Sequence, residues 1–193
     1  MVKIIGIQGI AGSGKTTLTH NLGKTLNATT IFWDDFDPIS TAPSDYLEWF
    51  KTSGDYNDWK YDALVDTLQS LKLNQTITCP VTKRVLIPTK YIFFDSPLGY
   101  DHKASGQLID FLVFLDTPPD IALARRLYRD FQPQAKRNDN DILEEIAIYL
   151  ESTRPLYMAI YERKSKADLI LDGNQPIETL ISKLLNTLKV KEI

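Results

Sequence analysis

A glycine-rich segment near the start of the chain has the residue types and the spacing of a phosphate-binding loop. Residues 9–16 read Gly-Ile-Ala-Gly-Ser-Gly-Lys-Thr and match G-x-x-x-x-G-K-[S/T] at every fixed position. Glycines let successive backbone N–H groups turn inward around phosphate oxygens, and a following helix adds the positive end of its dipole. The pattern therefore predicts binding of a nucleotide polyphosphate.

Two side chains of this loop suit the charge of the phosphates. Lys15 can reach the β- and γ-phosphates as a point charge, and Thr16 offers a hydroxyl to a bridging Mg²⁺. We therefore expect ATP and Mg²⁺ as cofactors and Lys15 as a catalytic residue. A turn without a ligand is disfavoured, because the segment lies between a strand pattern and an amphipathic helix pattern. The residues predicted to hold the nucleotide are Gly9, Ala11, Gly12, Ser13, Gly14, Lys15, Thr16 and Thr17.

Acidic residues follow two apolar runs of strand character. Asp34 and Asp35 come after one run and Asp95 after another, and the carboxyl ends of neighbouring parallel strands face one crevice. There, one carboxylate can accept a proton from an attacking hydroxyl, and another can hold the water shell of Mg²⁺. We predict Asp34 as the catalytic base and a metal contact, and Asp95 as a metal contact. The plainer alternative is that these residues end strands or cap helices, and Asp35 should point away from Asp34 if strand alternation continues.

Three arginines lie in a helix pattern that starts at Asp120. Arg126 and Arg129 are three positions apart and share a face, with Arg125 beside them. Guanidinium groups donate several hydrogen bonds to phosphoryl oxygens, and a mobile lid over residues 125–140 would close on ATP. We predict Arg125 and Arg129 as catalytic and Arg126 as substrate-binding; a solvated helix face is the alternative.

The apolar pattern indicates the scaffold that must position these side chains. Continuous apolar runs at 3–8, 30–34, 91–95, 111–116 and 168–172 are typical of strands buried on both faces of a parallel sheet. Helix patterns alternate with them at 15–26, 61–71, 120–131, 141–161 and 178–190. We therefore predict an α/β fold, in which a doubly wound, five-stranded parallel sheet carries helices on both faces.

Two segments do not fit this alternation and are predicted to wall an acceptor site. Residues 37–57 form a long insertion with two aromatic clusters, and residues 76–90 are polar with the pattern of a short hairpin. Excursions at the carboxyl side of a parallel sheet are where substrates usually bind. Trp33, Trp49 and Trp59 could stack on an acceptor ring, although aromatic residues in an insertion more often form local core.

Composition limits the class of protein. The chain of 193 residues fits one domain spanning 1–193, and its net charge of −3 shows no footprint for nucleic acid. The single cysteine, Cys79, excludes an internal disulfide and favours the cytoplasm. No apolar run approaches the ~20 residues of a membrane span, and residues 1–10 are interpreted as a buried strand, not a signal peptide. The composition leaves the oligomeric state open.

The quoted motifs resemble the uridine kinase and nicotinamide riboside kinase branch of P-loop kinases. The opening IIGIQGIAGSGKTTL and the later Asp-Asp-Phe resemble the riboside kinases, residues 124–130 resemble the lid helix of both families, and residues 149–170 resemble the uridine kinase tail. The resemblance implies that Asp34 is the general base and that the loop after the last strand packs on adenine. It also implies that an acidic residue near Asp58 holds the acceptor's ribose hydroxyls; Asp55 or Asp62 could take that role.

The chain also departs from that branch. Uridine kinases carry an aromatic residue and a histidine in the hairpin that reads the base, whereas residues 79–84 read Cys-Pro-Val-Thr-Lys-Arg. Asp95 stands where these families place a glutamate, and the glycine–arginine end of the uridine kinase lid is absent. Phosphoryl transfer is therefore predicted, and pyrimidine recognition is not.

Our leading hypothesis is ATP- and Mg²⁺-dependent phosphoryl transfer to a hydroxyl of a small, nucleoside-like molecule. A nucleoside monophosphate kinase would need further cations near the acceptor, where the candidates are Lys60, Lys83 and Arg84. An ATP-binding protein without kinase activity is the other alternative. A GTPase is poorly supported, because the glycine after Asp95 comes one residue too late for D-x-x-G.

Overall fold

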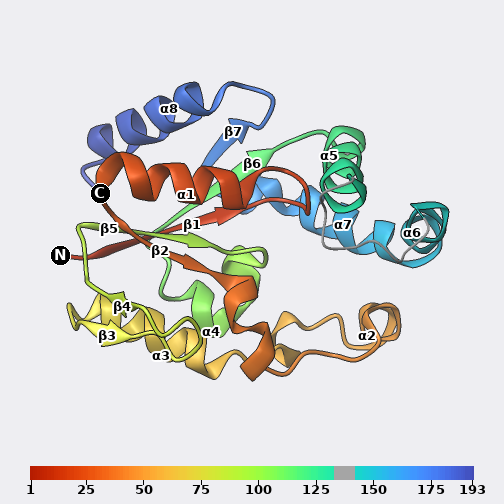
Figure 1. Cartoon of the computed structure of the whole chain (residues 1–193), viewed down its shortest axis with the longest axis horizontal. Coiled ribbons are helices and arrows are strands. Elements are labelled where there is room, and N and C mark those ends of the chain that lie inside the picture. The colour runs from red at the N-terminus through yellow and green to blue at the C-terminus, as the bar shows by residue number, and fades with distance from the viewer. Residues whose placement is uncertain (133–141) are drawn as a thin grey trace.

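The computed structural model describes residues 1–132 and 142–193. In these residues, a five-stranded parallel sheet runs in the order β2-β5-β1-β6-β7, with helices on both faces (Figure 1). This confirms the predicted doubly wound α/β fold. The strands are β1 (Lys3–Gln8), β2 (Thr29–Phe32), β5 (Tyr91–Asp95), β6 (Phe111–Asp116) and β7 (Leu169–Asp172).

Helices α1 and α8 cover one face of the sheet, and α3 and α4 cover the other (Figure 1). Helices α5, α6 and α7 lie beyond the carboxyl ends of the strands. The chain segments described include no helix with the length and apolarity needed to cross a membrane. The helices are α1 (Lys15–Leu26), α2 (Tyr46–Thr52), α3 (Asp62–Lys72), α4 (Lys103–Gly106), α5 (Pro119–Phe131), α6 (Ile142–Ile148), α7 (Arg154–Glu162) and α8 (Ile177–Val190).

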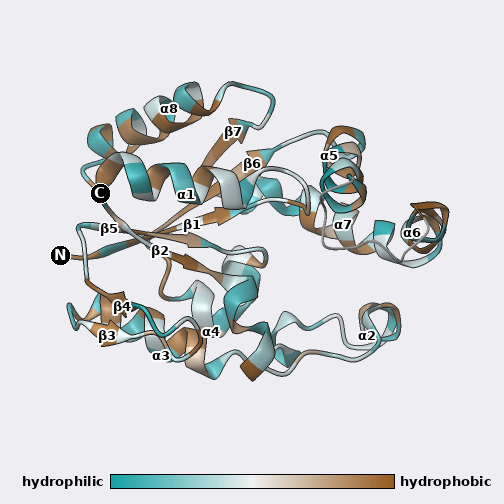
Figure 2. Cartoon of the chain, in the orientation of Figure 1, coloured by the Kyte–Doolittle hydropathy of each residue, from teal (hydrophilic) through white to brown (hydrophobic). Residues whose placement is uncertain are grey.

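Each face of the sheet has its own hydrophobic core, because side chains alternate along a strand. In β1, Ile4 belongs to the core under α3, whereas Ile5 belongs to the core under α1 and α8. Leu64 and Leu68 line one face of α3 and are fully buried, and each such side chain contributes about 1.5–3 kcal/mol to stability. Figure 2 shows the result, with apolar strands between helices whose outer faces are polar.

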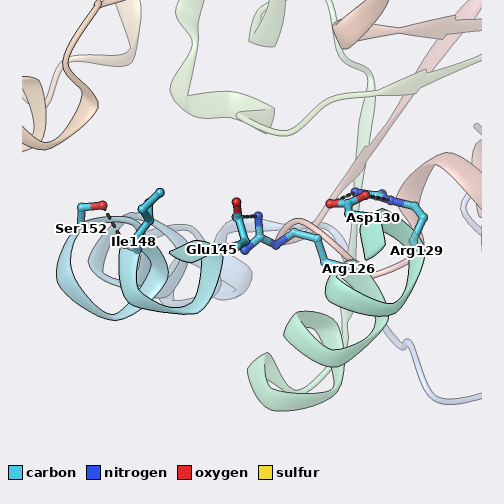
Figure 3. Close-up of polar contacts among 6 residues, drawn as sticks. All are labelled: Arg126, Arg129, Asp130, Glu145, Ile148 and Ser152. Carbon is cyan, nitrogen blue, oxygen red and sulfur yellow. Dashed lines mark hydrogen bonds and ion pairs between the residues drawn. The ribbon is translucent and has the colours of Figure 1, made fainter. Parts of the chain in front are cut away.

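The helix predicted over residues 141–161 is divided into three parts. A π-helix, Tyr149–Thr153, separates α6 from α7, and position 141 lies outside the described residues. Pro155 explains the division, because proline has no N–H and its ring conflicts with the carbonyl four residues earlier. A wider π turn at this point accommodates the missing bond. The Ser152 hydroxyl donates to the carbonyl of Ile148 at 2.7 Å, which satisfies one acceptor there (Figure 3).

The strand predicted to end at Asp34 ends at Phe32, and a 3₁₀ helix, Trp33–Ile39, follows it. Trp33 and Phe36 are three residues apart, the period of a 3₁₀ helix, and both are buried in the core. We expected Asp35 to point away from Asp34 if strand alternation continued. It does not continue, because both residues lie in the 3₁₀ helix.

The polar segment 76–90 contains the short hairpin that its pattern predicted. Strands β3 (Ile77–Thr78) and β4 (Val85–Leu86) pair antiparallel in a separate two-stranded sheet. The Thr29 hydroxyl at the start of β2 donates to the carbonyl of Ile87 at 2.5 Å, and the Thr89 hydroxyl accepts from the Thr29 N–H at 3.1 Å. These bonds tie the hairpin to the edge of the main sheet.

Candidate active site

The phosphate-binding loop connects β1 to α1 and depends on glycine at two positions. Gly12 and Gly14 have φ angles of 83° and 102°, in the left-handed region that residues with a side chain rarely adopt. A Cβ atom on Gly12 would lie only 2.0 Å from the carbonyl oxygen of Ala122 in α5. The loop can therefore take this shape, and contact α5 this closely, only with glycine.

Hydrogen bonds within the loop and to Thr117, the residue after β6, hold its backbone in place. The Ser13 N–H donates to Ile10 at 3.0 Å, and the buried Thr117 hydroxyl donates to the Ser13 carbonyl at 3.0 Å. The Lys15 ammonium donates to the carbonyl of Ile10 at 3.2 Å. Lys15 thus reaches back over the loop, where its charge faces the space that the backbone encloses.

A cleft of about 390 Å³ lies above this loop. It brings the phosphate-binding loop together with Asp34, Asp95, Arg125 and Arg129, which come from three other parts of the chain. Hereafter we call it the main cleft. It is lined by Gly9, Ala11, Gly12, Gly14, Lys15, Thr16, Thr17, Asp34, Asp95, Pro97, Arg125, Arg129, Tyr157 and Ile160.

Asp95 and Thr16 form a hydrogen-bonded pair in the lining of the main cleft. The Thr16 hydroxyl donates to Asp95 Oδ2 at 2.6 Å, and Asp95 is only 6% exposed at the end of β5. Burial raises the pKa of Asp95, while the Lys15 charge and the Thr16 hydrogen bond oppose that rise. A carboxylate beside a hydroxyl is a hard oxygen donor set, which fits Mg²⁺.

This donor set is too small to enclose a metal ion. Among the described residues, no group of three His, Cys, Asp or Glu side chains is arranged to hold one. Mg²⁺ commonly keeps several water ligands and binds through one or two carboxylates together with substrate phosphates. The Thr16–Asp95 pair fits that mode of binding.

Asp34 lines the main cleft and lies two residues after the end of β2, in the 3₁₀ helix. It is exposed, and its charge contributes to raising the pKa of both Asp95 and Arg129, which places it near each of them. β2 pairs with β5 so that Phe32 is opposite Asp95, and this register brings the two aspartates to the same edge of the sheet.

A second cavity of about 220 Å³ adjoins the main cleft. The two spaces have Thr16, Asp34 and Asp95 in common. Asp35 lines the second cavity and is not among the residues that line the main cleft. The second cavity is lined by Thr16, His20, Phe32, Asp34, Asp35, Arg84 and Asp95.

The arginines of α5 divide into two groups. Arg125 lines the main cleft and donates to the carbonyl of Gly173, after β7, at 3.1 Å. Arg129 also lines the main cleft, but its guanidinium donates to both oxygens of Asp130, at 2.7 and 3.2 Å (Figure 3). This pairing is the main reason that the pKa of Arg129 is raised.

Arg126 does not line the main cleft. It is only 9% exposed, and its Nη1 atom donates to Glu145 Oε1 of α6 at 2.6 Å (Figure 3). Its guanidinium also lies over the ring of Tyr157 in α7, 5.7 Å from the ring centre. Arg126 therefore connects α5 to α6 and α7. Part of the lid predicted over residues 125–140 lies outside the described residues.

Residues 4–178 match the model of the Phosphoribulokinase / Uridine kinase family. The chain belongs to this family. The uridine kinase of Borrelia duttonii is 30% identical over 203 aligned positions, covering 97% of this chain and 96% of that protein. The uridine kinase of Borrelia garinii subsp. bavariensis is 31% identical, covering 89% and 86%. The chain is thus a P-loop kinase, a phosphotransferase.

Solved structures show the same fold at low identity. Shikimate kinase from Bacteroides thetaiotaomicron superposes with a TM-score of 0.54 at 17% identity, covering 97% of this chain and 98% of that one. Shikimate kinase from Aquifex aeolicus gives a TM-score of 0.50 at 19% identity, covering 98% of each chain. At such identities, the likeness concerns the fold of the kinase alone.

The three acidic candidates for holding the acceptor, Asp55, Asp58 and Asp62, do not line the main cleft or the second cavity. Asp58 accepts hydrogen bonds from Trp49 Nε1 at 3.1 Å and from the Ser53 hydroxyl at 2.7 Å. Asp55 accepts from the Asn57 N–H at the start of a 3₁₀ turn, and Asp62 lies in the first turn of α3. The role of Asp58 in holding the acceptor stays a prediction.

The tryptophans belong to the core of the kinase. Trp33 and Trp49 are 4% and 7% exposed, and Trp59 is partly buried against the same core. The interpretation as local core, not as stacking platforms, is therefore confirmed for Trp33 and Trp49.

Some lining residues were not predicted from the sequence. Tyr157 and Ile160 of α7 form a wall of the main cleft, and their only sequence signal is a three-residue helical spacing. His20 lies one helical turn after Thr16 and lines the second cavity, so the four-residue spacing from the loop could have indicated it.

Proposed function

We propose that this kinase transfers the γ-phosphoryl group of ATP to a hydroxyl of a small, nucleoside-like acceptor, with Mg²⁺ bound. One observation carries the proposal: a single cleft gathers the phosphate-binding loop, two aspartates and two arginines. The similarity of nearly the whole chain to uridine kinases supports an acceptor of nucleoside type. One unpaired cysteine and a need for ATP fit a cytoplasmic location.

The donor phosphates would be bound by the backbone N–H groups of residues 9–16 and by the Lys15 ammonium. Thr16 and Asp95, with Asp34 at the edge, would hold Mg²⁺ through oxygen atoms and water. When bound, the ion neutralises charge on the β- and γ-phosphates. Arg125 and Arg129 would contact the transferring group from the α5 side, since guanidinium groups stabilise charge that develops there.

Asp34 is the residue that we assign as general base. The acceptor oxygen attacks the γ-phosphorus, the bond from that phosphorus to the β–γ bridging oxygen breaks, and ADP leaves. The proton of the acceptor hydroxyl passes to the Asp34 carboxylate. Asp34 suits this role because it lines both the main cleft and the second cavity, so donor and acceptor can meet beside it. General-base help of this kind is typically worth ~10²–10⁴ in rate.

Arg129 would exchange part of its present contacts for the phosphoryl group during the reaction. Its Nε and Nη2 atoms donate to Asp130, so two of its five N–H donors are engaged there. Because Arg129 is 65% exposed in its side chain, this exchange requires little desolvation. Closure of the α5 region over the nucleotide would favour it. Substrate binding by Arg126 remains a prediction, and its ion pair with Glu145 would have to open first.

Transfer to a panel of acceptors tests the proposal. Purified kinase is incubated with ATP, Mg²⁺ and one nucleoside, sugar or vitamin at a time, and phosphorylated products are identified by mass spectrometry. We expect a product from at least one nucleoside-like compound, and none from the Lys15→Ala variant, whose turnover should fall by orders of magnitude. Binding of ATP without transfer to any acceptor would favour a non-catalytic ATP-binding protein instead.

A further inference from the structure

The turn that follows β6 lies directly against the phosphate-binding loop. A Cβ atom on Gly9 would be only 2.9 Å from the carbonyl oxygen of Leu115, so the loop and the end of β6 leave no room for a methyl group. The Thr117 hydroxyl donates to the Ser13 carbonyl at 3.0 Å, and Thr117 is fully buried. A buried carbonyl that loses such a partner is costly, so this bond should hold the loop at a set distance from the turn.

The Thr117 hydroxyl also lies against Gly173, the residue after β7. The Gly173 N–H donates to the Asp116 carbonyl at 2.9 Å, which holds Gly173 beside the turn. A Cβ atom on Gly173 would be only 1.9 Å from Thr117 Oγ1. The φ angle of Gly173 is not positive, so its backbone conformation does not call for glycine. The missing side chain instead leaves room for the Thr117 hydroxyl.

Gly173 in turn holds Arg125, which lines the main cleft. Arg125 Nη1 donates to the Gly173 carbonyl at 3.1 Å. Arg125 is also joined to the turn through the chain, because α5 begins at Pro119, two residues after Thr117. The phosphate-binding loop and Arg125 are therefore both fixed relative to Thr117, one through Ser13 and the other through Gly173.

The second arginine of the main cleft is held differently. Arg129 donates to Asp130, its neighbour in the chain, and its side chain is 65% exposed. Arg125 instead donates to a backbone carbonyl at the end of the central sheet. The orientation of Arg125 therefore depends on the sheet and on the turn after β6, whereas that of Arg129 depends on an adjacent side chain.

We infer that Thr117 is a positioning residue for phosphoryl transfer, which holds the phosphate-binding loop and Arg125 at a fixed separation. Thr117 does not line the main cleft, so it acts through its neighbours and touches no substrate. A misplacement of about 1 Å can cost ~10²-fold in rate, which makes this separation important for turnover. The inference rests on the proposed function, because that proposal assigns Arg125 a contact with the transferring group.

Removal of a single hydroxyl tests the inference. Thr117→Val keeps the shape of the side chain but cannot donate to Ser13, and it should lower kcat by roughly tenfold to a hundredfold. Affinity for ATP should change less, because the backbone N–H groups of the loop remain. Thr117→Ser keeps the hydroxyl and should keep most of the activity. Thr67→Val is the matched control: Thr67 is 2% exposed, donates to the Ala63 carbonyl at 2.7 Å and lines neither the main cleft nor the second cavity, so kcat should be unchanged.

A double variant shows whether Thr117 acts through Arg125. In the Arg125→Ala background, Thr117→Val should lower kcat much less than it does in wild type, because effects of coupled residues do not add. Gly173→Ala disturbs the same contact from the other side and should lower kcat as well. Thermal unfolding establishes that each variant is folded. The inference would be overturned by full kcat in both Thr117→Val and Gly173→Ala, by equal losses in the two backgrounds, or by a loss in Thr117→Ser as large as that in Thr117→Val.

A binding measurement separates this inference from the proposed function. ADP with Mg²⁺ and aluminium fluoride imitates the transferring phosphoryl group, and its affinity is measured by calorimetry without any turnover. Thr117→Val should lose more affinity for this complex than for ADP with Mg²⁺ alone. Equal losses for the two ligands would refute a positioning role. Failure of transfer to every acceptor, with the difference in affinity intact, would count against the proposed function and not against Thr117.

Discussion

Asp34 and Asp35 are neighbours in sequence but face different spaces. Asp34 lines both the main cleft and the second cavity, whereas Asp35 lines only the second. We predict that Asp34→Asn lowers kcat by at least ~10² and largely keeps ATP affinity, because it removes the base and no phosphate contact. Asp35→Asn, the matched control, should do much less. Single-turnover assays with the true acceptor check this, and the reverse order would mean that the base is the other carboxylate.

The pKa of Asp95 gives a second prediction for a single residue. Burial raises this pKa above its ordinary value of 3.8, so folding favours the protonated carboxyl. Stabilisation from this group is complete below pH 3.8 and is lost as pH rises through the raised pKa. Asp95→Asn cannot ionise and still accepts from Thr16, so it should unfold at a higher temperature than wild type at pH 7.

The advantage of Asp95→Asn should shrink toward pH 3.8 and below, where wild-type Asp95 is protonated as well. The same variant should bind Mg²⁺ at least about tenfold more weakly in the presence of ATP. Thermal unfolding over a pH series and Mg²⁺ titration of activity measure the two effects. A variant that is less stable at neutral pH would show that the charge of Asp95 is well compensated in the folded kinase.

The residues of the phosphate-binding loop are the part of the candidate site that the sequence identified best. Their chemistry follows from local spacing, as for Lys15 and Thr16, which the chain places in one cleft by a short loop. Arg126 could not be assigned in this way. Its position in the helical pattern does not show whether its side chain faces solvent or another helix. Only the tertiary contact with Glu145 shows that α6 covers this face of α5.

Substitutions of Arg126 and Arg129, three residues apart in α5, should have different effects, one mainly on stability and the other mainly on turnover. The Arg126–Glu145 pair is nearly buried, at 10% and 13% side-chain exposure, and loss of one partner of a buried pair typically costs about 3–5 kcal/mol. Arg126→Ala should therefore lower the Tm by several degrees. Arg129→Ala should lower the Tm less than Arg126→Ala does, since the Arg129 side chain is 65% exposed in its pair with Asp130, but it should lower kcat by at least ~10².

Calorimetry and steady-state kinetics on both variants separate these effects. If Arg126→Ala kept its Tm and raised only the KM for the acceptor, Arg126 would be a substrate ligand, as its position in the sequence suggested. If Arg129→Ala lost stability but not turnover, the pairing with Asp130 would be structural.

The contact between the phosphate-binding loop and α5 can be tested with glycine substitutions. Gly12→Ala places a Cβ 2.0 Å from the Ala122 carbonyl oxygen, and should weaken ATP binding by about tenfold or more, equivalent to ~1.4 kcal/mol. Gly54→Ala is the control, because Gly54 also has a positive φ, 56°, but its nearest such contact is 3.6 Å away. It should lose about 1–2 kcal/mol of stability and no ATP affinity. Equal ATP affinity in both variants would contradict the role of the loop–helix contact.

At the level of elements, the periodicity of apolar residues predicted the strands and most helices, because one face or both faces of each are buried. The exceptions are two places where packing or backbone hydrogen bonding overrides the local pattern. β2 ends early because Trp33 and Phe36 both enter the core, and the C-terminal helix is interrupted by a π turn before Pro155. The periodicity of apolar residues predicts neither feature. It does not show which side chains enter the core after a strand, or how the helix adjusts to the hydrogen bond that Pro155 cannot donate.

The whole molecule combines a P-loop kinase fold with two segments outside the strand–helix alternation, the first insertion and the β3–β4 hairpin. Family membership follows from the match over residues 4–178. The parallel sheet sets the carboxyl ends of β2, β5 and β1 side by side, and the loop, Asp34 and Asp95 meet there. The hairpin and the first insertion are the regions where the sequence said least about the ligand. The position of the hairpin depends on contacts between residues far apart in the sequence, such as the hydrogen bonds of Thr29 with Ile87 and Thr89.

The central claim is that the γ-phosphoryl group passes from ATP to an acceptor hydroxyl at this site. A single-turnover reaction with ATP labelled at the γ-phosphate tests it most directly, with the label followed into acceptor and inorganic phosphate. We predict that the label appears in the acceptor, that it does so much more slowly in Asp34→Asn, and that little inorganic phosphate forms. Label released only as inorganic phosphate, in the presence of every acceptor supplied, would contradict the claim.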